Sequence, residues 1–123
     1  MEKPNILIVE DNTIIAADLA SKIEQMGFNV IGTAATAEEA IDWASQFCPQ
    51  LVLMCVQLDG ESDSIKAAST IHELCDKTFV VFLAARRQTA AIDAGELRGP
   101  YCVVSRPFMM SDLCFHIKTL LKM

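Results

Sequence analysis

The strongest constraint on the fold is an alternation of short apolar runs with amphipathic segments, repeated five times along the chain. The apolar runs cover Asn5 to Val9, Phe28 to Thr33, Leu51 to Cys55, Thr78 to Ala84 and Tyr101 to Ser105. The first, third and fourth runs are almost unbroken, which is typical of strands buried on both faces of a sheet, and the more mixed second run suits an edge strand. The pattern predicts parallel strands joined by helical crossovers.

Apolar residues at helical spacing predict a helix after each strand. The first, from about Thr13 to Met26, has Asn12 as its N-cap and Gly27 as its stop signal. The second begins at a capping box formed by Thr36 and Glu39. The remaining helices are predicted at about Ser62 to Cys75, within Gln88 to Leu97, and from Ser111 onward. We therefore expect an α/β fold, with one parallel sheet covered by helices on both faces.

Length and composition predict one soluble domain over residues 1–123. Hydrophobic residues make up 52% of the chain, and no apolar run approaches the roughly 20 residues that a membrane-spanning helix needs. The opening stretch MEKPNILIVED is not a signal peptide, because its apolar run is too short and is followed at once by acidic residues. A cytoplasmic protein without a membrane contact is the expectation.

The charge pattern argues against nucleic acid as a direct partner. The formal net charge is -6, and the largest basic cluster is the pair Arg86 and Arg87. A chain that binds a phosphate backbone usually carries a basic patch.

The five cysteines are odd in number and widely spaced, without a C-x-x-C motif (Cys48, Cys55, Cys75, Cys102 and Cys114). Most of them lie in apolar surroundings. This pattern predicts reduced core residues rather than a disulfide or zinc framework.

Ligands of such sheets bind at the carboxyl ends of the strands, so the residues found there are the candidate site. Glu10 and Asp11 follow the first strand, the third ends at Cys55, the fourth ends at Ala84, and Arg106 follows the fifth. Adjacent carboxylates suit a hard cation such as Mg²⁺. The alternative, of equal weight on these residues alone, is that the acids only favour the N-terminus of the next helix.

Four blocks of sequence together resemble the receiver domain of two-component response regulators. They are ILIVEDN (6–12), PQLVLMCVQLDG (49–60), VVFLAA (80–85) and SRPF (105–108), and the resemblance covers essentially the whole chain. It implies a doubly wound, five-stranded flavodoxin-like sheet in the order 2-1-3-4-5. It also implies a domain that accepts a phosphoryl group from a histidine kinase onto an aspartate, with Mg²⁺ held by an acidic pair.

On this resemblance, Glu10 and Asp11 match the acidic pair, whereas other positions depart from the pattern. Cys55 stands where the family carries the phosphorylated aspartate. Ala84 stands where a Thr or Ser hydroxyl would bind the phosphoryl group. The departures remove a nucleophile and a phosphate ligand.

Three further positions follow from the same resemblance. Arg106 replaces the family's lysine, Val103 stands where an aromatic switch residue is usual, and Pro107 is expected to follow a cis peptide bond. Phe108 is expected to bury its ring beneath that turn. Arg106 keeps the positive charge and can form a bidentate pair with Glu10 or Asp11, although an unpaired surface arginine is the alternative.

The chemistry of Cys55 decides the expected function. Mg²⁺ does not favour sulfur ligands, and two neighbouring carboxylates should raise the thiol pKa by repulsion between like charges. We therefore expect weak Mg²⁺ binding through Glu10 and Asp11, and a neutral, unreactive thiol. Asp59 could substitute as acceptor, but it lies beyond the strand and fits a turn better. His72 and His116 are expected at solvated or half-buried helix positions away from the site.

The main hypothesis is a receiver-like signalling domain, not an enzyme, that has lost normal phosphorylation by a natural or engineered change at Cys55. It would bind a histidine kinase or other signalling proteins, with homodimerisation as a further option. As in receivers, the contact surface would be the fourth helix, fifth strand and fifth helix (within 88–97, 101–105 and from 111). A redox sensor or thiol enzyme at Cys55 would need a depressed thiol pKa. A flavodoxin-like flavin carrier would need a Ser/Thr/Gly-rich phosphate cradle in place of EDNT.

Overall fold

The computed structural model describes residues 3–123, which form one parallel five-stranded sheet in the order β2-β1-β3-β4-β5. The strands are β1 (Asn5–Val9), β2 (Asn29–Ala34), β3 (Leu51–Cys55), β4 (Phe79–Ala85) and β5 (Tyr101–Arg106). The helices are α1 (Thr13–Gln25), α2 (Ala37–Phe47), α3 (Glu61–Leu74), α4 (Thr89–Ala94) and α5 (Met110–Leu120), with a short 3-10 helix η1 (Arg86–Gln88) before α4. The predicted fold class is confirmed.

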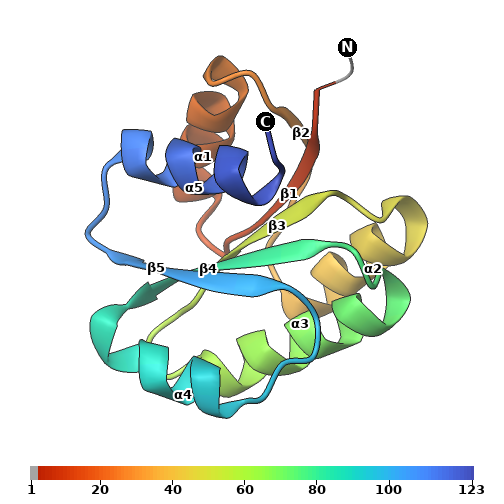
Figure 1. Cartoon of the computed structure of the whole chain (residues 1–123), viewed down its shortest axis with the longest axis vertical. Coiled ribbons are helices and arrows are strands. Elements are labelled where there is room, and N and C mark those ends of the chain that lie inside the picture. Colours follow the sequence, from red (N-terminus) through yellow and green to blue (C-terminus); the bar gives the residue numbers. More distant parts are fainter. Residues whose placement is uncertain (1–2) are drawn as a thin grey trace.

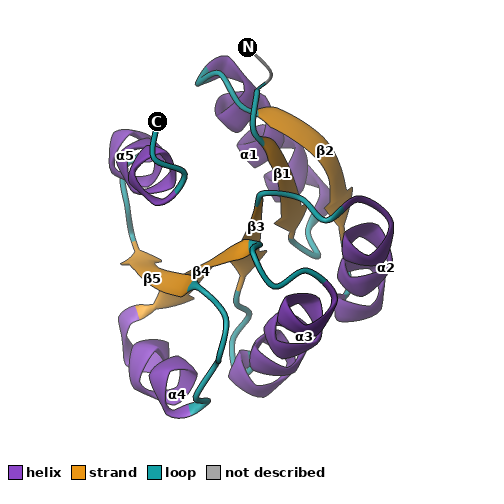
Figure 2. Ribbon diagram, turned by 45° about the vertical axis from the view of Figure 1, so that its right-hand side comes forward, coloured by secondary structure: helices purple, strands orange, loops and turns teal. Residues whose placement is uncertain are grey.

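Helices cover both faces of the sheet, as the crossover rule requires. Helices α1 and α5 lie on one face, and α2, α3 and α4 lie on the other (Figures 1 and 2). Across the described residues, no helix combines the length and apolar character needed to cross a membrane.

The two faces of the sheet are packed with side chains of different size. Under α1 and α5 the core consists largely of Ile, Leu and Phe, for example Ile23, Phe28 and Ile117. Under α2 and α3 it includes four alanines, Ala40, Ala44, Ala67 and Ala68. Short side chains let helices approach closely, so α2 and α3 lie side by side.

Local signals set most of the helix ends where the sequence indicated. The side-chain oxygen of Asn12 accepts hydrogen bonds from the backbone N–H groups of Ile14 and Ile15, both at 3.0 Å. Gly27 ends α1 with a left-handed φ of 100°. At α2, Thr36 Oγ1 accepts from Glu39 N–H, while the Glu39 carboxylate accepts from the N–H of Ala35 rather than of Thr36.

The fourth helix lies within the range 88–97 that the sequence predicted for it. Helix α4 ends at Ala94, because Gly95 packs against Ile65 of α3 and Glu96 takes a left-handed φ of 51°. A left-handed residue cannot continue a right-handed helix. The segment up to Leu97 is therefore a loop that returns the chain to β5.

The prediction that all five cysteines are reduced was wrong for Cys48 and Cys75, which form a disulfide. Cys48 is the C-cap of α2 and Cys75 is the C-cap of α3, and their Cα atoms are 5.5 Å apart. Because α2 and α3 pack side by side, residues far apart in sequence meet at their ends. Cys55, Cys102 and Cys114 are free thiols.

His72 is more buried than predicted, with 8% of its surface exposed. Its Nε2 donates to the carbonyl of Pro100 at 3.0 Å, and its ring lies against Gly99, where any side chain would overlap it. The ring thus fills the space between α3 and the loop before β5. This position is structural and does not belong to the candidate site at the carboxyl ends of the strands, called the strand-end site below.

Candidate functional site

The strand register brings the predicted site residues to one edge of the sheet. Val9 pairs with Met54, Cys55 pairs with Leu83, and Ala85 pairs with Arg106. Because β1, β3, β4 and β5 are parallel, their carboxyl ends finish within a residue or two of one another.

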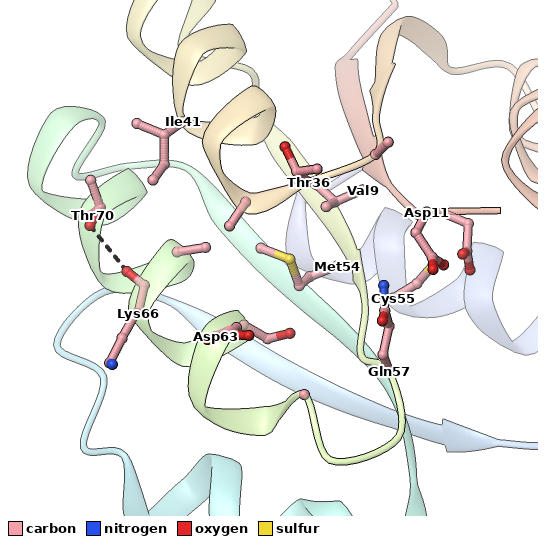
Figure 3. Close-up of a pocket in the computed structure, with 16 residues that line it drawn as sticks. Val9, Asp11, Thr36, Ile41, Met54, Cys55, Gln57, Asp63, Lys66 and Thr70 are labelled. Atoms are coloured by element: carbon pink, nitrogen blue, oxygen red, sulfur yellow. Dashed lines mark hydrogen bonds between the residues drawn. The ribbon is translucent and has the colours of Figure 1, made fainter. Parts of the chain in front are cut away.

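Two cavities meet at this edge. One, of about 430 Å³, lies between α2 and α3 and reaches Glu10, Asp11 and Cys55. Figure 3 shows Asp11, Cys55 and Gln57 at one end of this cavity, and Ile41, Lys66 and Thr70 at the other. The second, of about 620 Å³, also reaches Glu10, Asp11 and Cys55, and its wall includes Arg106. The acids, the thiol and the guanidinium therefore share one region, as predicted.

Glu10 is tied to the backbone of its own loop. Its Oε2 accepts a hydrogen bond from Asn12 N–H at 2.9 Å. Burial and a hydrogen bond with Asp11 raise the pKa of Glu10, while the Asn12 N–H and the charge of Arg106 oppose the rise. One oxygen of the Glu10 carboxylate is thus engaged by the backbone of the turn, whereas Asp11 is exposed.

Cys55 carries a neutral thiol. Burial raises the pKa of Cys55 to about 12, and the negative charge of Glu10 adds to the rise, against the opposing charge of Arg106. The direction agrees with the sequence-based expectation, but its main cause is loss of water rather than repulsion by carboxylates. At neutral pH the side chain is neither a nucleophile nor an anionic ligand.

Arg106 contacts a backbone carbonyl rather than a carboxylate. Its Nη2 donates to Leu83 O at 2.8 Å, and the same carbonyl accepts from Val56 N–H at 2.9 Å. The only ion pair within residues 3–123 is the helical pair Lys22 and Asp18. The expected pairing of Arg106 with Glu10 or Asp11 was therefore wrong, because β5 ends beside β4 and the guanidinium donates to the Leu83 carbonyl.

Ala84 and Val103 lie in or against the core beneath α2, α3 and α4. Ala84 is completely buried, and it offers no hydroxyl to the site. The aromatic residue of β5 is Tyr101, on the same face of the strand as Val103. Its ring lies edge-on to Phe82, and its hydroxyl donates to Asp93 of α4 at 2.8 Å.

Pro107 follows a cis peptide bond from Arg106, the isomer expected of this turn. Phe108 is half-buried rather than fully covered, and it packs against the core beneath α1 and α5. Asp59 is exposed, with a left-handed φ of 58°, in the turn beyond β3.

Gln88 is a functional candidate that sequence analysis missed. Its side chain is 2% exposed and bonds to two loops at once. Oε1 accepts from Ala85 N–H at 2.8 Å, and Nε2 donates to Gln57 O at 2.8 Å and to Glu61 Oε1 at 2.6 Å. The loop after β3 and the loop after β4 are thereby joined. Nothing in the polar run RRQT distinguishes this residue before the fold is known.

The donor set fits a hard divalent cation poorly. Within residues 3–123, no group of three or more His, Cys, Asp and Glu side chains is placed to hold a metal ion. Glu10 already accepts from Asn12, and Cys55 offers a protonated sulfur. Mg²⁺ prefers several oxygen ligands in near-octahedral geometry.

Residues 6–118 match the family model of the response regulator receiver domain. This chain belongs to that family. The match covers the five strands except Asn5, the cysteine at the end of β3 and the proline turn after β5.

Known relatives agree with this assignment. The chain is 33% identical over 110 residues to the transcriptional regulatory protein PdtaR of Mycobacterium tuberculosis, covering 88% of the chain and 52% of the relative. It is 35% identical over 112 residues to the phyllosphere-induced regulator PhyR of Methylorubrum extorquens, covering 88% and 40%. The chain thus spans about half or less of the length of these curated relatives.

A solved structure supports the same fold. The solution structure of the PhyR receiver domain of Erythrobacter litoralis is 30% identical, with a TM-score of 0.81, covering 99% of the chain and 92% of that domain. The receiver family and its flavodoxin-like topology are therefore established for this chain.

Proposed function

We propose that this receiver domain works through protein contacts and is not switched by ordinary phosphorylation. The observation that carries the proposal is Cys55: the residue at the acceptor position is a half-buried thiol whose pKa is raised to about 12. An acyl phosphate needs a carboxylate, and a protonated thiol cannot replace it. In this proposal Cys55 is equivalent in position, but not in chemistry, to the phosphorylated aspartate.

The residues around Cys55 support the same conclusion. Ala84, at the position of the phosphate-binding hydroxyl, is completely buried and has no donor. Arg106, at the position of the lysine, donates to the Leu83 carbonyl. Val103, at the switch position, has no ring to move. A phosphoryl group arriving here would find one of its usual ligands missing and another already engaged.

Mg²⁺ should bind weakly, through Glu10 and Asp11, with an affinity on the order of millimolar or poorer. The engagement of Glu10 with Asn12 supports this expectation. Calorimetric titration of the protein with MgCl₂ measures the affinity directly. A micromolar dissociation constant would contradict the proposed donor set.

The Gln88 side chain joins two loops at the site by hydrogen bonds that do not depend on a phosphoryl group. It links the loop after β3, through Gln57 and Glu61, to the loop after β4, through Ala85. In the proposed function, these loops stay in one arrangement and the domain presents a constant surface to its partner. The protein then acts as a fixed recognition module.

We propose α4, β5 and α5 as the partner surface, with a histidine kinase or another signalling protein as the partner and a homodimer as the further option. Helix α4 is held to β5 by the hydrogen bond between Tyr101 and Asp93, and α5 carries Phe115, 68% exposed. Exposed aromatic residues are frequent anchors in protein interfaces.

The direct test is incubation with acetyl phosphate and Mg²⁺, followed by intact-mass spectrometry under non-hydrolysing conditions. We expect no gain of a phosphoryl group. A receiver with an intact acceptor aspartate serves as the positive control for the reagent. A stable phosphoryl gain that survives Asp59→Asn would overturn the proposal, because Asp59 is the nearest alternative acceptor beyond β3.

The alternative of a thiol enzyme or redox sensor centred on Cys55 receives no support from this environment. Such a cysteine needs a depressed pKa and a neighbouring base. The Cys55 pKa is raised instead, and neither histidine lines the two cavities at the site.

A further inference from the structure

The disulfide between Cys48 and Cys75 lies at the end of the molecule opposite Cys55. Cys48 directly follows α2 and Cys75 directly follows α3, before the amino ends of β3 and β4. A third cavity, of about 540 Å³, is lined by both cysteines together with Lys77, Phe79 and Lys122. Small-molecule sites commonly have volumes of about 300–1,000 Å³.

The two cysteines differ in access to solvent. Cys48 is exposed, whereas Cys75 is 6% exposed. A dissolved thiol or disulfide can therefore reach Cys48 first, and Cys75 is placed to resolve the product because the two Cα atoms are 5.5 Å apart. This division into an accessible and a resolving cysteine is typical of reversible redox pairs.

We propose that Cys48 and Cys75 are a reversible thiol–disulfide exchange site whose co-substrate is a low-molecular-weight disulfide. In a reducing compartment thiols are kept mostly reduced, so a disulfide between exchangeable cysteines forms there only when the redox balance shifts. The site is separate from Cys55 and does not depend on the function proposed for the strand-end site.

The exchange balances in two steps. The Cys48 thiolate attacks one sulfur of the small disulfide, which releases one small thiolate and leaves a mixed disulfide on Cys48. The Cys75 thiolate then attacks the Cys48 sulfur and releases the second small thiolate. The protein thiols lose two protons and two electrons, and the small disulfide is reduced to two thiols. Reduction by excess small thiol follows the same steps in reverse.

The bridge acts on the packing of α2 against α3. It joins the C-terminal ends of the two helices, while Ile41 of α2 and Lys66 and Thr70 of α3 line the 430 Å³ cavity farther along (Figure 3). Oxidation should therefore hold α2 and α3 together without changing a residue at the strand-end site. In the reduced form the two helices remain packed through their alanines but lose the covalent tie.

The test uses the full chain, equilibrated with mixtures of reduced and oxidised glutathione from fully reducing to fully oxidising. Samples are quenched by alkylation and analysed by intact mass and peptide mapping. We expect one reversible transition, a peptide pair linked through Cys48 and Cys75, and a melting temperature higher in the oxidised form by on the order of 10 °C. Thiols that never pair, or a bridge that excess reduced glutathione cannot open in the folded protein, would overturn the proposal.

Matched variants assign the roles of the two cysteines. Cys75→Ser should trap a glutathione adduct on Cys48, whereas Cys48→Ser should give neither a bridge nor an adduct on buried Cys75. Cys102→Ser and Cys114→Ser should leave the transition unchanged. A bridge between Cys75 and any other cysteine in the wild-type protein would contradict the assignment. Peptide mapping of the wild type gives this result even if the variants do not fold.

Discussion

Cysteines lie at both ends of the sheet, and their surroundings differ. Cys55, at the carboxyl end of β3, is an isolated thiol beside Glu10, with its pKa raised to about 12. Cys48, before the amino end of the same strand, is exposed and paired with Cys75. Burial and a neighbouring charge keep Cys55 protonated, whereas access to solvent and a nearby second cysteine suit Cys48 to the exchange proposed above.

The largest expected effect is on alkylation after reduction of the disulfide. At about pH 8, a thiol with the pKa of Cys55 has roughly a thousandfold less thiolate than an ordinary cysteine. Iodoacetamide should therefore label Cys55 far more slowly than exposed Cys48, as measured by quantitative peptide mapping over time. Guanidinium-unfolded protein is the control, in which both sites should react at similar rates. Equal labelling in the folded protein would remove the distinction between the two ends.

The next effect concerns the hydrogen bonds of Gln88, at the carboxyl ends of the strands. Gln88→Ala removes three hydrogen bonds and leaves buried or partly buried partners at Ala85, Gln57 and Glu61. We expect a loss of about 1–3 kcal/mol in the free energy of unfolding, measured by urea denaturation. Gln46→Ala, at an exposed position of α2, should change it by less than about 0.5 kcal/mol. If both variants match the wild type, Gln88 does not hold the loops together.

Cys55→Asp should strengthen Mg²⁺ binding by roughly tenfold, because it replaces sulfur with oxygen beside Glu10 and Asp11. Acetyl phosphate should then label the variant only partly, since Ala84 still lacks a hydroxyl. Partner binding and oligomeric state should change little, since Val103 still lacks an aromatic ring. Calorimetry, intact mass and sedimentation measure the three quantities.

The matched variant for this experiment is Cys55→Asp combined with Ala84→Ser, which should label more fully. Phosphorylation of Cys55→Asp at an ordinary receiver rate, with dimerisation in response, would mean that one residue alone disables an intact switch. A variant that gains neither metal nor phosphate would contradict the placement of Cys55 beside the acidic pair.

The last effect is on alkaline stability. In the unfolded chain Cys55 loses its proton at about pH 8.5, whereas in the folded chain it keeps the proton up to about pH 12. Between these values the unfolded state binds fewer protons, so stability falls as the pH rises. The melting temperature of the wild type should therefore fall more steeply from pH 9 to pH 11 than that of Cys55→Ser. Parallel curves would show that the folded-state pKa is not raised.

The sequence predicted the elements whose signals are local. Strands β1 and β3 have the predicted bounds, with β1 ending before the polar residue Glu10, and α1 is bounded by Asn12 and Gly27. The gathering of Glu10, Asp11, Cys55 and Arg106 followed from topology alone, because parallel strands end at one edge.

What the sequence did not reveal depends on contacts between distant segments. The pairing of Cys48 with Cys75 requires α2 and α3 to lie side by side, which alanine packing decides. The hydrogen bonds of Gln88 join two loops that are distant in sequence. The hydrogen bond from Arg106 to the Leu83 carbonyl depends on the register of β4 and β5, which the sequence alone does not give.

The central claim, that the acceptor position holds a neutral thiol, is tested most directly by measuring the pKa of Cys55. Selective ¹³Cβ-cysteine labelling lets NMR follow each thiol separately through a pH titration of the folded, oxidised protein. The account predicts a transition for Cys55 at about pH 12, or none before alkaline unfolding. A transition at or below the ordinary value of about 8.5 would contradict it, because Cys55 would then be a reactive thiolate near neutral pH.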